Sequence, residues 1–228
     1  MNQRDAWEAV AERWAGFVRG GGDPPYAWNS AAFLKLVPAP GQLTMDVGCG
    51  EGRFARELSA RGHRLVAVDV SPTMASLARH ADPEGDYRVA DAAALPLGDG
   101  EADLVVAFMS LQDIDDVASA LREAARVLEP HGRVCLAVLH PVFSAGRIEG
   151  EEPDARFVIA GSYLDTFRED SPMIGAPFTV PTFHRPLEVY FCALEDAGFL
   201  VEAVRELPTR RRAPGRIPLF LHVRGVKS

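Results

Sequence analysis

The sequence predicts a single α/β domain whose mostly parallel, seven-stranded sheet carries helices on both faces. Three observations support this prediction. Short apolar runs alternate with helical segments between residues 43 and 139, and such alternation implies parallel strands joined by right-handed crossovers. A glycine-rich turn follows the first apolar run. Two last runs, 199–207 and 217–226, flank a turn and predict an antiparallel C-terminal hairpin.

The first 40 residues are expected to form a helical cap. Apolar side chains recur at helical spacing over residues 3–18, so one face of this segment is expected to be buried. Glycines and prolines at 20–25 interrupt regular structure. A second helix is expected over 28–37, because the residue before Pro38 disfavours helical backbone.

Residues 41–139 are expected to form a ligand-binding core of strands and helices. Helices are predicted over residues 52–60, 72–80 and 116–128. Gly62 is expected to end the first helix, and the second begins after Ser71. Ser71 followed by proline is the favoured order of cap and first helical residue. The predicted strands of this core are the apolar runs 43–47, 65–70, 87–90, 102–108 and 133–139.

The C-terminal part is expected to hold a variable region and a closing unit. Residues 140–186 show no clear periodicity, and a loop of this length in a compact domain is usually functional. A helix over 187–197 and the terminal hairpin are expected to complete the sheet within 187–228. The basic turn of this hairpin, Arg210–Arg212, is expected to be solvated.

Composition limits the classes of function. The net charge of −8 and the pI of about 5.3 argue against binding to a nucleic-acid backbone, which needs a basic surface. No apolar run reaches the roughly 18 residues of a membrane span, and the N-terminus lacks the apolar core of a signal peptide. The three cysteines form no C-x-x-C pair. We expect a cytoplasmic protein without a metal site.

The turn from Asp46 to Gly52 predicts a site for a nucleoside cofactor. Glycines let the backbone approach a ligand closely, and the helix that follows directs its free N–H groups toward it. An acid one strand over, Asp69, can accept hydrogen bonds from ribose hydroxyls. The glycines stand two residues apart, unlike the G-x-G-x-x-G pattern of dinucleotide sites, and Asp46 suits an ammonium group better than a pyrophosphate.

These motifs resemble those of the class I S-adenosylmethionine-dependent methyltransferases, especially the small-molecule group called type 11. The resemblance covers residues 43–139, and 184–199 more loosely, from His184-Arg185-Pro186-Leu187 to Ala197-Gly198-Phe199. It implies a Rossmann-like fold. His131 replaces the usual first glycine of the family's V-L-x-P-G-G turn, and histidine tolerates left-handed backbone better than most residues.

The resemblance implies S-adenosylmethionine as the cofactor. In the family, the position of Asp69 binds both ribose hydroxyls, Val70 and Met74 border the adenine, and Asp91 receives the adenine amino group. The segment after the fourth strand, from Phe108 to Gln112, lines the cofactor and opens to the substrate. The full set of implied cofactor-binding residues is Asp46, Gly48, Cys49, Gly50, Asp69, Val70, Met74, Asp91, Ala92 and Met109.

Methyl transfer to a hydroxyl or ammonium also needs a group that removes a proton. His140 and His184 are the candidate bases, although each could instead hold the backbone at a strand end or helix start. The candidate substrate-binding residues are Tyr26, Trp28, Gln112 and Arg185; Gln112 and Asp113 could equally cap the next helix.

A small-molecule acceptor is expected, with oxygen preferred over nitrogen or carbon. The alternatives are a non-methylating binder of the same cofactor and, less favoured, an NAD-dependent oxidoreductase. A homodimer is also considered, and neither a nucleic acid nor a membrane is expected as a partner.

Overall fold

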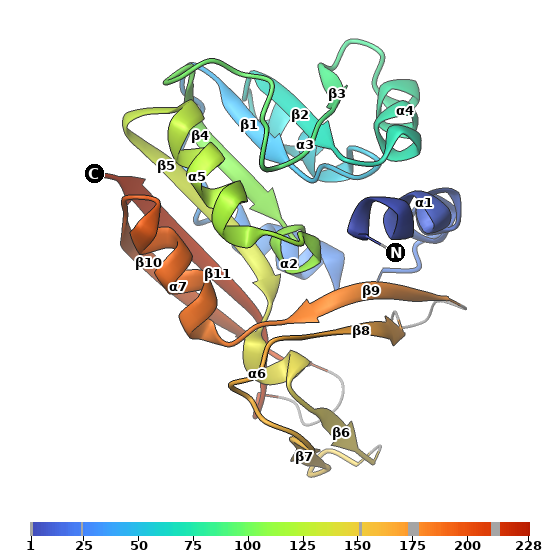
Figure 1. Cartoon of the computed structure of the whole chain (residues 1–228). Helices are drawn as coiled ribbons and strands as arrows, with labels where there is room; N and C mark the ends of the chain where they lie inside the picture. Colours follow the sequence, from blue (N-terminus) through green and yellow to red (C-terminus); the bar gives the residue numbers. More distant parts are fainter. Residues whose placement is uncertain (1, 24, 151, 173–177, 211–214) are drawn as a thin grey trace.

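A seven-stranded sheet forms the centre of the computed structural model, which describes residues 2–23, 25–150, 152–172, 178–210 and 215–228 (Figure 1). Its strands are β1 (Thr44–Val47), β2 (Leu65–Asp69), β3 (Tyr87–Val89), β4 (Ala102–Phe108), β5 (Leu128–Leu139), β10 (Phe199–Pro208) and β11 (Pro218–Lys227). Their order is β10-β11-β5-β4-β1-β2-β3. The strands β1 to β5 are parallel, and β11 is antiparallel to β5 and β10. The predicted sheet and its antiparallel hairpin are confirmed.

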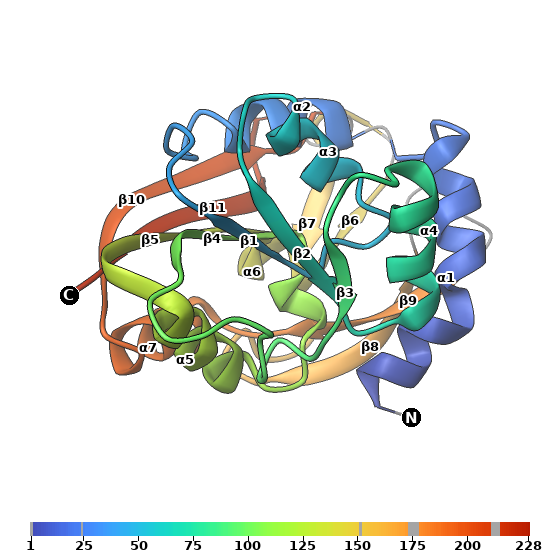
Figure 2. The same ribbon diagram turned by 90° about the horizontal axis from the view of Figure 1, so that it is seen from above.

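Helices cover both faces of this sheet, as predicted. Figure 2 shows α2 (Tyr26–Phe33) and α3 (Arg53–Ser59) on one face, and α5 (Val117–Val127) and α7 (Leu187–Asp196) on the other. The helices α1 (Gln3–Arg19) and α4 (Pro72–Ala81) pack against each other beside β3.

Two polar side chains explain where α4 and α5 begin. The Ser71 hydroxyl accepts a hydrogen bond from the Met74 amide at 3.1 Å. The Asp116 carboxylate accepts one from the Ser119 amide at 2.9 Å. Each bond satisfies an amide of the first turn that has no partner within the helix.

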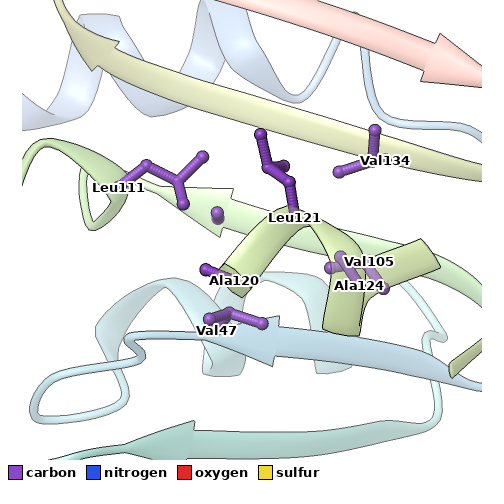
Figure 3. A pocket seen from close by; sticks show the side chains of 8 residues that line it. Val47, Val105, Leu111, Ala120, Leu121, Ala124 and Val134 are labelled. Carbon is purple, nitrogen blue, oxygen red and sulfur yellow. The ribbon is translucent and has the colours of Figure 1, made fainter. Parts of the chain in front are cut away.

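Alternation along β4 divides the core into two layers. Leu104 and Val106 point toward α2 and α3, whereas Val105 and Ala107 point toward α5 and α7. The second layer contains an apolar void of about 10 Å³ between α5 and the sheet, with Leu111, Leu121 and Val134 among its lining (Figure 3). The void is about large enough for one water molecule, and apolar voids of this kind stay dry. It is therefore a small packing defect and not a ligand site.

Two elements differ from the predicted ranges by more than one residue. The second helix spans Tyr26–Phe33 instead of 28–37. The strand β5 begins at Leu128 instead of 133, because Leu128 is already extended where it pairs with Ala102 of β4. His131 then takes left-handed backbone, with φ of 63°, as the resemblance suggested.

Residues 140–186 contain regular structure that the sequence did not predict. Helix α6 (Pro141–Ser144) is followed by the hairpin β6 (Arg147–Glu149) and β7 (Arg156–Val158). A second hairpin, β8 (Phe167–Pro172) and β9 (Thr179–His184), reaches α1. Both hairpins stand outside the main sheet (Figure 1). Arg211 and Arg212 of the predicted basic turn lie outside the described residues.

Candidate cofactor and acceptor site

The glycine loop between β1 and α3 is tied to the neighbouring strands. The amides of Gly48 and Cys49 both donate to the Val68 carbonyl of β2, at 2.8 and 2.9 Å. Gly48 has φ of 76°, and a Cβ there would lie 2.3 Å from the Cβ of Ser110. The Ser110 hydroxyl donates to the Val47 carbonyl at 2.6 Å, so the second residue after β4 fixes the loop. Only glycine fits at position 48.

Gly50 differs from Gly48 because its surroundings are open. It also has positive φ, 57°, but a Cβ built on it meets nothing within 4 Å. Its amide donates to Oδ2 of Asp69 at 2.8 Å. The loop therefore presents bare backbone to open space beside a carboxylate, which suits a bound ligand.

Asp46, at the end of β1, is a buried acid with an unsatisfied atom. Its side chain is 1% exposed, and Oδ2 has no hydrogen-bond partner among the described residues. Burial, with the nearby Asp69 charge, raises the pKa of Asp46 to about 7. An unpaired buried acceptor is costly, so this oxygen fits a ligand that brings a donor or a positive charge.

Asp69 ends β2 on the other side of the loop. Its Oδ1 accepts from the Ser71 amide at 2.9 Å, and the two backbone bonds leave lone pairs on both oxygens. Desolvation raises the pKa of Asp69 to about 6, although the Ser71 and Gly50 amides act to lower it. The two acids and the open backbone at Gly50 fit a cationic nucleoside, as the sequence predicted for S-adenosylmethionine.

The residues expected around the adenine lie at the ends of β2 and β3. Val70 follows β2 directly and is half-buried, and Met74 is buried in the first turn of α4. Asp91 is exposed after β3, where its Oδ1 accepts from the Ala93 amide at 2.9 Å. Ala92 is buried in the core.

Helix α1 contacts the same edge through Glu8, which the sequence analysis did not single out. Its carboxylate accepts hydrogen bonds from the Ser71 hydroxyl, the Thr73 hydroxyl at 2.6 Å and the Thr73 amide at 3.2 Å. These bonds hold α1 against the N-terminus of α4. The helical pattern of residues 3–18 predicts the helix but carries no signal for this contact.

Cys49 within the loop is a buried thiol that donates to the Gly50 carbonyl at 3.6 Å. Burial, with the Asp69 and Asp46 charges, raises its pKa. A neutral thiol is a poor nucleophile, so packing explains this residue.

The segment after β4 has unusual backbone. Met109 has φ of 60°, and its carbonyl accepts from Nε2 of Gln112 at 2.6 Å. Oε1 of Gln112 is buried and has no hydrogen-bond partner among the described residues. Left-handed backbone at a non-glycine residue is uncommon and concentrates at functional sites.

The two aromatic candidates lie in different places. The Tyr26 ring meets Phe108 edge-on at 5.7 Å, beside the end of β4, and the Arg53 guanidinium covers its face at 3.3 Å. Trp28 packs on Phe220 of β11 at 5.2 Å, and Arg210 stacks over it at 4.4 Å. Of the two, only Tyr26 lies next to the strand end that precedes Gln112.

Both candidate histidines are buried, and both ring nitrogens of each have protein partners. Nδ1 of His140 accepts from the Val142 amide at 3.0 Å, so Nε2 carries the proton and donates to Glu206 at 2.9 Å. Burial lowers the pKa of His140. Nε2 of His184 donates to the Tyr163 carbonyl at 2.9 Å, and Nδ1 accepts from the Ser144 hydroxyl at 2.7 Å.

Arg185 is buried, with its side chain directed at backbone carbonyls. Its guanidinium donates to the carbonyls of Leu111, Gln112, Ile114 and Asp115, all in the segment after β4. It also packs over the Phe183 ring at 4.2 Å. The donors predicted to bind a substrate carboxylate are thus engaged within the protein.

Two kinds of feature are absent from the described residues. They include no group of three or more histidine, cysteine or acidic side chains placed to hold a metal. No helix among them combines the length and apolar character needed to cross a bilayer.

Comparison with known proteins gives a consistent result. The family model described as "Methyltransferase domain" matches residues 45–136. The ubiquinone biosynthesis O-methyltransferase of Xanthomonas axonopodis is 30% identical over 174 residues, 72% of each chain. The ubiquinone/menaquinone biosynthesis C-methyltransferase UbiE of Caulobacter vibrioides is 29% identical over 83% of this chain and 71% of its own.

A solved structure extends the similarity to the fold. The crystal structure of an S-adenosylmethionine-dependent methyltransferase from Mesorhizobium loti superposes with a TM-score of 0.72 at 27% identity. The match covers 86% of this chain and 96% of that one.

Proposed function

The chain belongs to the class I S-adenosylmethionine-dependent methyltransferases of type 11, and on that premise we propose that it methylates a small molecule at an oxygen atom. The cofactor supplies an electrophilic methyl group on a positively charged sulfur. The protein must bind and orient both partners, exclude water and accept a proton.

The unsatisfied, buried carboxylate oxygen of Asp46 is the observation that carries the cofactor assignment. In our proposal Asp46 faces the ammonium of the methionine part, and Asp69 binds the ribose hydroxyls. Gly48, Cys49 and Gly50 offer loop backbone at close approach. The adenine is bordered by Val70, Met74, Asp91 and Ala92, with Met109 on the side of the acceptor.

Oxygen is preferred because the relative that is 30% identical over 72% of this chain is named an O-methyltransferase. Tyr26 and Gln112 are proposed to line the acceptor side of the site, since both lie at the end of β4. Carbon is the second candidate, because one relative is named a C-methyltransferase and another an O-methyltransferase. The structure gives His140, His184, Trp28 and Arg185 protein contacts that support structural roles for them.

Calorimetric titration with S-adenosylhomocysteine tests the cofactor site, with NADH as the control. We expect saturable binding of the homocysteine product alone. Asp69→Ala should weaken this binding by about 1.5–3 kcal/mol, as expected for hydrogen bonds to a charged group. That loss corresponds to roughly a 10- to 150-fold increase in Kd. Binding of NADH instead, or unchanged affinity in the variant, would contradict the placement.

A panel of phenols, carboxylates and amines then tests the acceptor, with methyl-labelled S-adenosylmethionine as donor. Label transfer to a hydroxyl or carboxylate supports the proposal, and transfer to a ring carbon supports the second candidate. Tight cofactor binding without transfer to any acceptor class would identify a non-methylating binder.

A further inference from the structure

The segment after β4 holds a carboxylate that none of the roles above uses. Asp113 ends the 3₁₀ turn Leu111–Asp113, which follows the carboxyl end of β4. Its Oδ1 accepts from the Thr182 hydroxyl of β9 at 3.0 Å, and its Oδ2 from Nε2 of Gln112 at 3.2 Å. We propose that Asp113 is the catalytic base that removes the proton from the methyl acceptor. This inference rests on the proposed function.

Asp113 differs from the two histidines in the number of hydrogen-bond acceptor positions that remain free. Each histidine has one acceptor nitrogen, and a hydrogen bond from Val142 or Ser144 already occupies it. Each oxygen of a carboxylate has two acceptor positions. Asp113 therefore retains one position on each oxygen, and its side chain is only half-buried, so an acceptor can reach it.

The charges around Asp113 suit a base that works near neutral pH. Desolvation raises the pKa of Asp113 to about 7, and the Asp69 charge from β2 acts in the same direction. The hydrogen bonds from Thr182 and Gln112 and the charge of Arg185 act to lower it. Tyr190 of α7 faces the same group, and burial, with the Asp113 charge, raises the pKa of Tyr190. A base with a pKa near the working pH is both available and strong enough to act.

Arg185 holds this base in place. Its guanidinium donates to carbonyls on both sides of Asp113, from Leu111 and Gln112 before it to Ile114 and Asp115 after it. We assign Arg185 as a positioning residue, because its contacts fix the backbone that carries the base. This assignment gives a role to the His-Arg-Pro-Leu segment that the sequence analysis had singled out.

The proton-transfer step balances. The acceptor hydroxyl gives its proton to the Asp113 carboxylate as its oxygen forms a bond to the methyl carbon. The electron pair of the broken carbon–sulfur bond stays on sulfur, which becomes a neutral thioether. The positive charge of the sulfonium and the negative charge of Asp113 are both lost, and the protonated acid later releases its proton to solvent.

The test uses Asp113→Asn, with Asp115→Asn as a control that removes an acid two residues away. With the acceptor that the panel identifies, Asp113→Asn should lower kcat by about 10²- to 10⁴-fold, the usual contribution of a general base. The Kd of this variant for S-adenosylhomocysteine should stay within about threefold of the wild-type value. Loss of one hydrogen bond to a charged group would change the Kd by more than that. The control should keep both values. A kcat near wild type in Asp113→Asn would overturn the assignment.

A second measurement needs no acceptor. The infrared band of the protonated Asp113 carboxyl, identified by its absence in Asp113→Asn, is followed against pH in protein saturated with S-adenosylhomocysteine. We expect a midpoint near pH 7. A midpoint below about pH 5, as in an ordinary aspartate, would overturn the assignment. Failure of the wild type to bind the homocysteine product would instead refute the proposed cofactor site.

The positioning role is tested by Arg185→Lys against Arg126→Lys. Arg126 also donates to backbone carbonyls, those of Leu95 and Leu97, but in the loop that precedes β4. We expect both variants to lose stability and only Arg185→Lys to lose kcat, with the KM for S-adenosylmethionine unchanged. Equal kcat in the two variants would leave Arg185 with a structural role alone.

Discussion

The contact between α1 and α4 provides a sharp test of how the edge of the sheet beside Asp69 is built. Glu8 accepts three hydrogen bonds from Ser71 and Thr73, and its charge lies at the N-terminus of α4. Glu8→Gln keeps the size of the side chain but removes the charge and one acceptor oxygen. Hydrogen bonds to charged groups contribute about 1.5–3 kcal/mol, and the half-buried position of Glu8 favours the lower part, about 1.5–2 kcal/mol.

Urea unfolding at neutral pH measures this loss, with Glu12→Gln as the control because Glu12 is exposed on the same helix. For a chain of this size, the loss corresponds to a Tm lowered by roughly 3–8 °C. Burial acts to raise the pKa of Glu8, but the hydrogen bonds from Ser71 and Thr73 together hold it below its usual value. The stabilisation by Glu8 is therefore fully present at a pH above the pKa that Glu8 has in the unfolded chain. It is lost as the pH falls through the lower pKa that Glu8 has in the folded protein. Equal stability of the two variants at pH 7 would refute the reasoning.

Two further predictions concern the glycine loop and a buried histidine. Gly48→Ala should prevent the loop from forming, because the new Cβ would lie 2.3 Å from the Cβ of Ser110. Gly50→Ala should lower the free energy of thermal unfolding by only about 1–2 kcal/mol, because a Cβ there meets nothing within 4 Å. It should nevertheless abolish calorimetric binding of S-adenosylhomocysteine. Burial lowers the pKa of His222 to about 4, so the free energy of unfolding should fall by about 2–3 kcal/mol as pH drops from 6.5 toward 4. In urea titrations His222→Phe should lose this pH dependence, and an unchanged slope would exclude His222 as its source.

Local patterns were sufficient to predict the parts of the fold that repeat a simple rule. The strands β1, β2 and β4 are short apolar runs, and the glycine loop and the Ser71 cap follow the first two of them. The carboxyl ends of parallel strands meet at one edge, so the placement of Asp46 and Asp69 beside each other followed from topology. The glycine spacing could be interpreted because the positive φ of Gly48, Gly50 and Gly52 is a property of the loop itself and does not depend on distant contacts.

The sequence could not predict features that depend on contacts between distant segments. The hairpins of residues 140–186 have short strands without an apolar alternation, and they pack outside the main core. His184 received a candidate catalytic role because its partners, Ser144 and the Tyr163 carbonyl, lie 40 and 21 residues away in the chain. Glu8 was missed for the same reason, since its partners lie more than 60 residues away.

The acids that we propose to meet the cofactor or the acceptor oppose the stability of the free protein. Desolvation raises the pKa values of Asp46, Asp69 and Asp113, and the Asp69 charge raises those of both others, so each is a carboxylate held where ionisation is costly. A cationic ligand offsets this cost, because opposite charge favours the ionised form. This arrangement therefore favours a sulfonium cofactor over a neutral nucleoside.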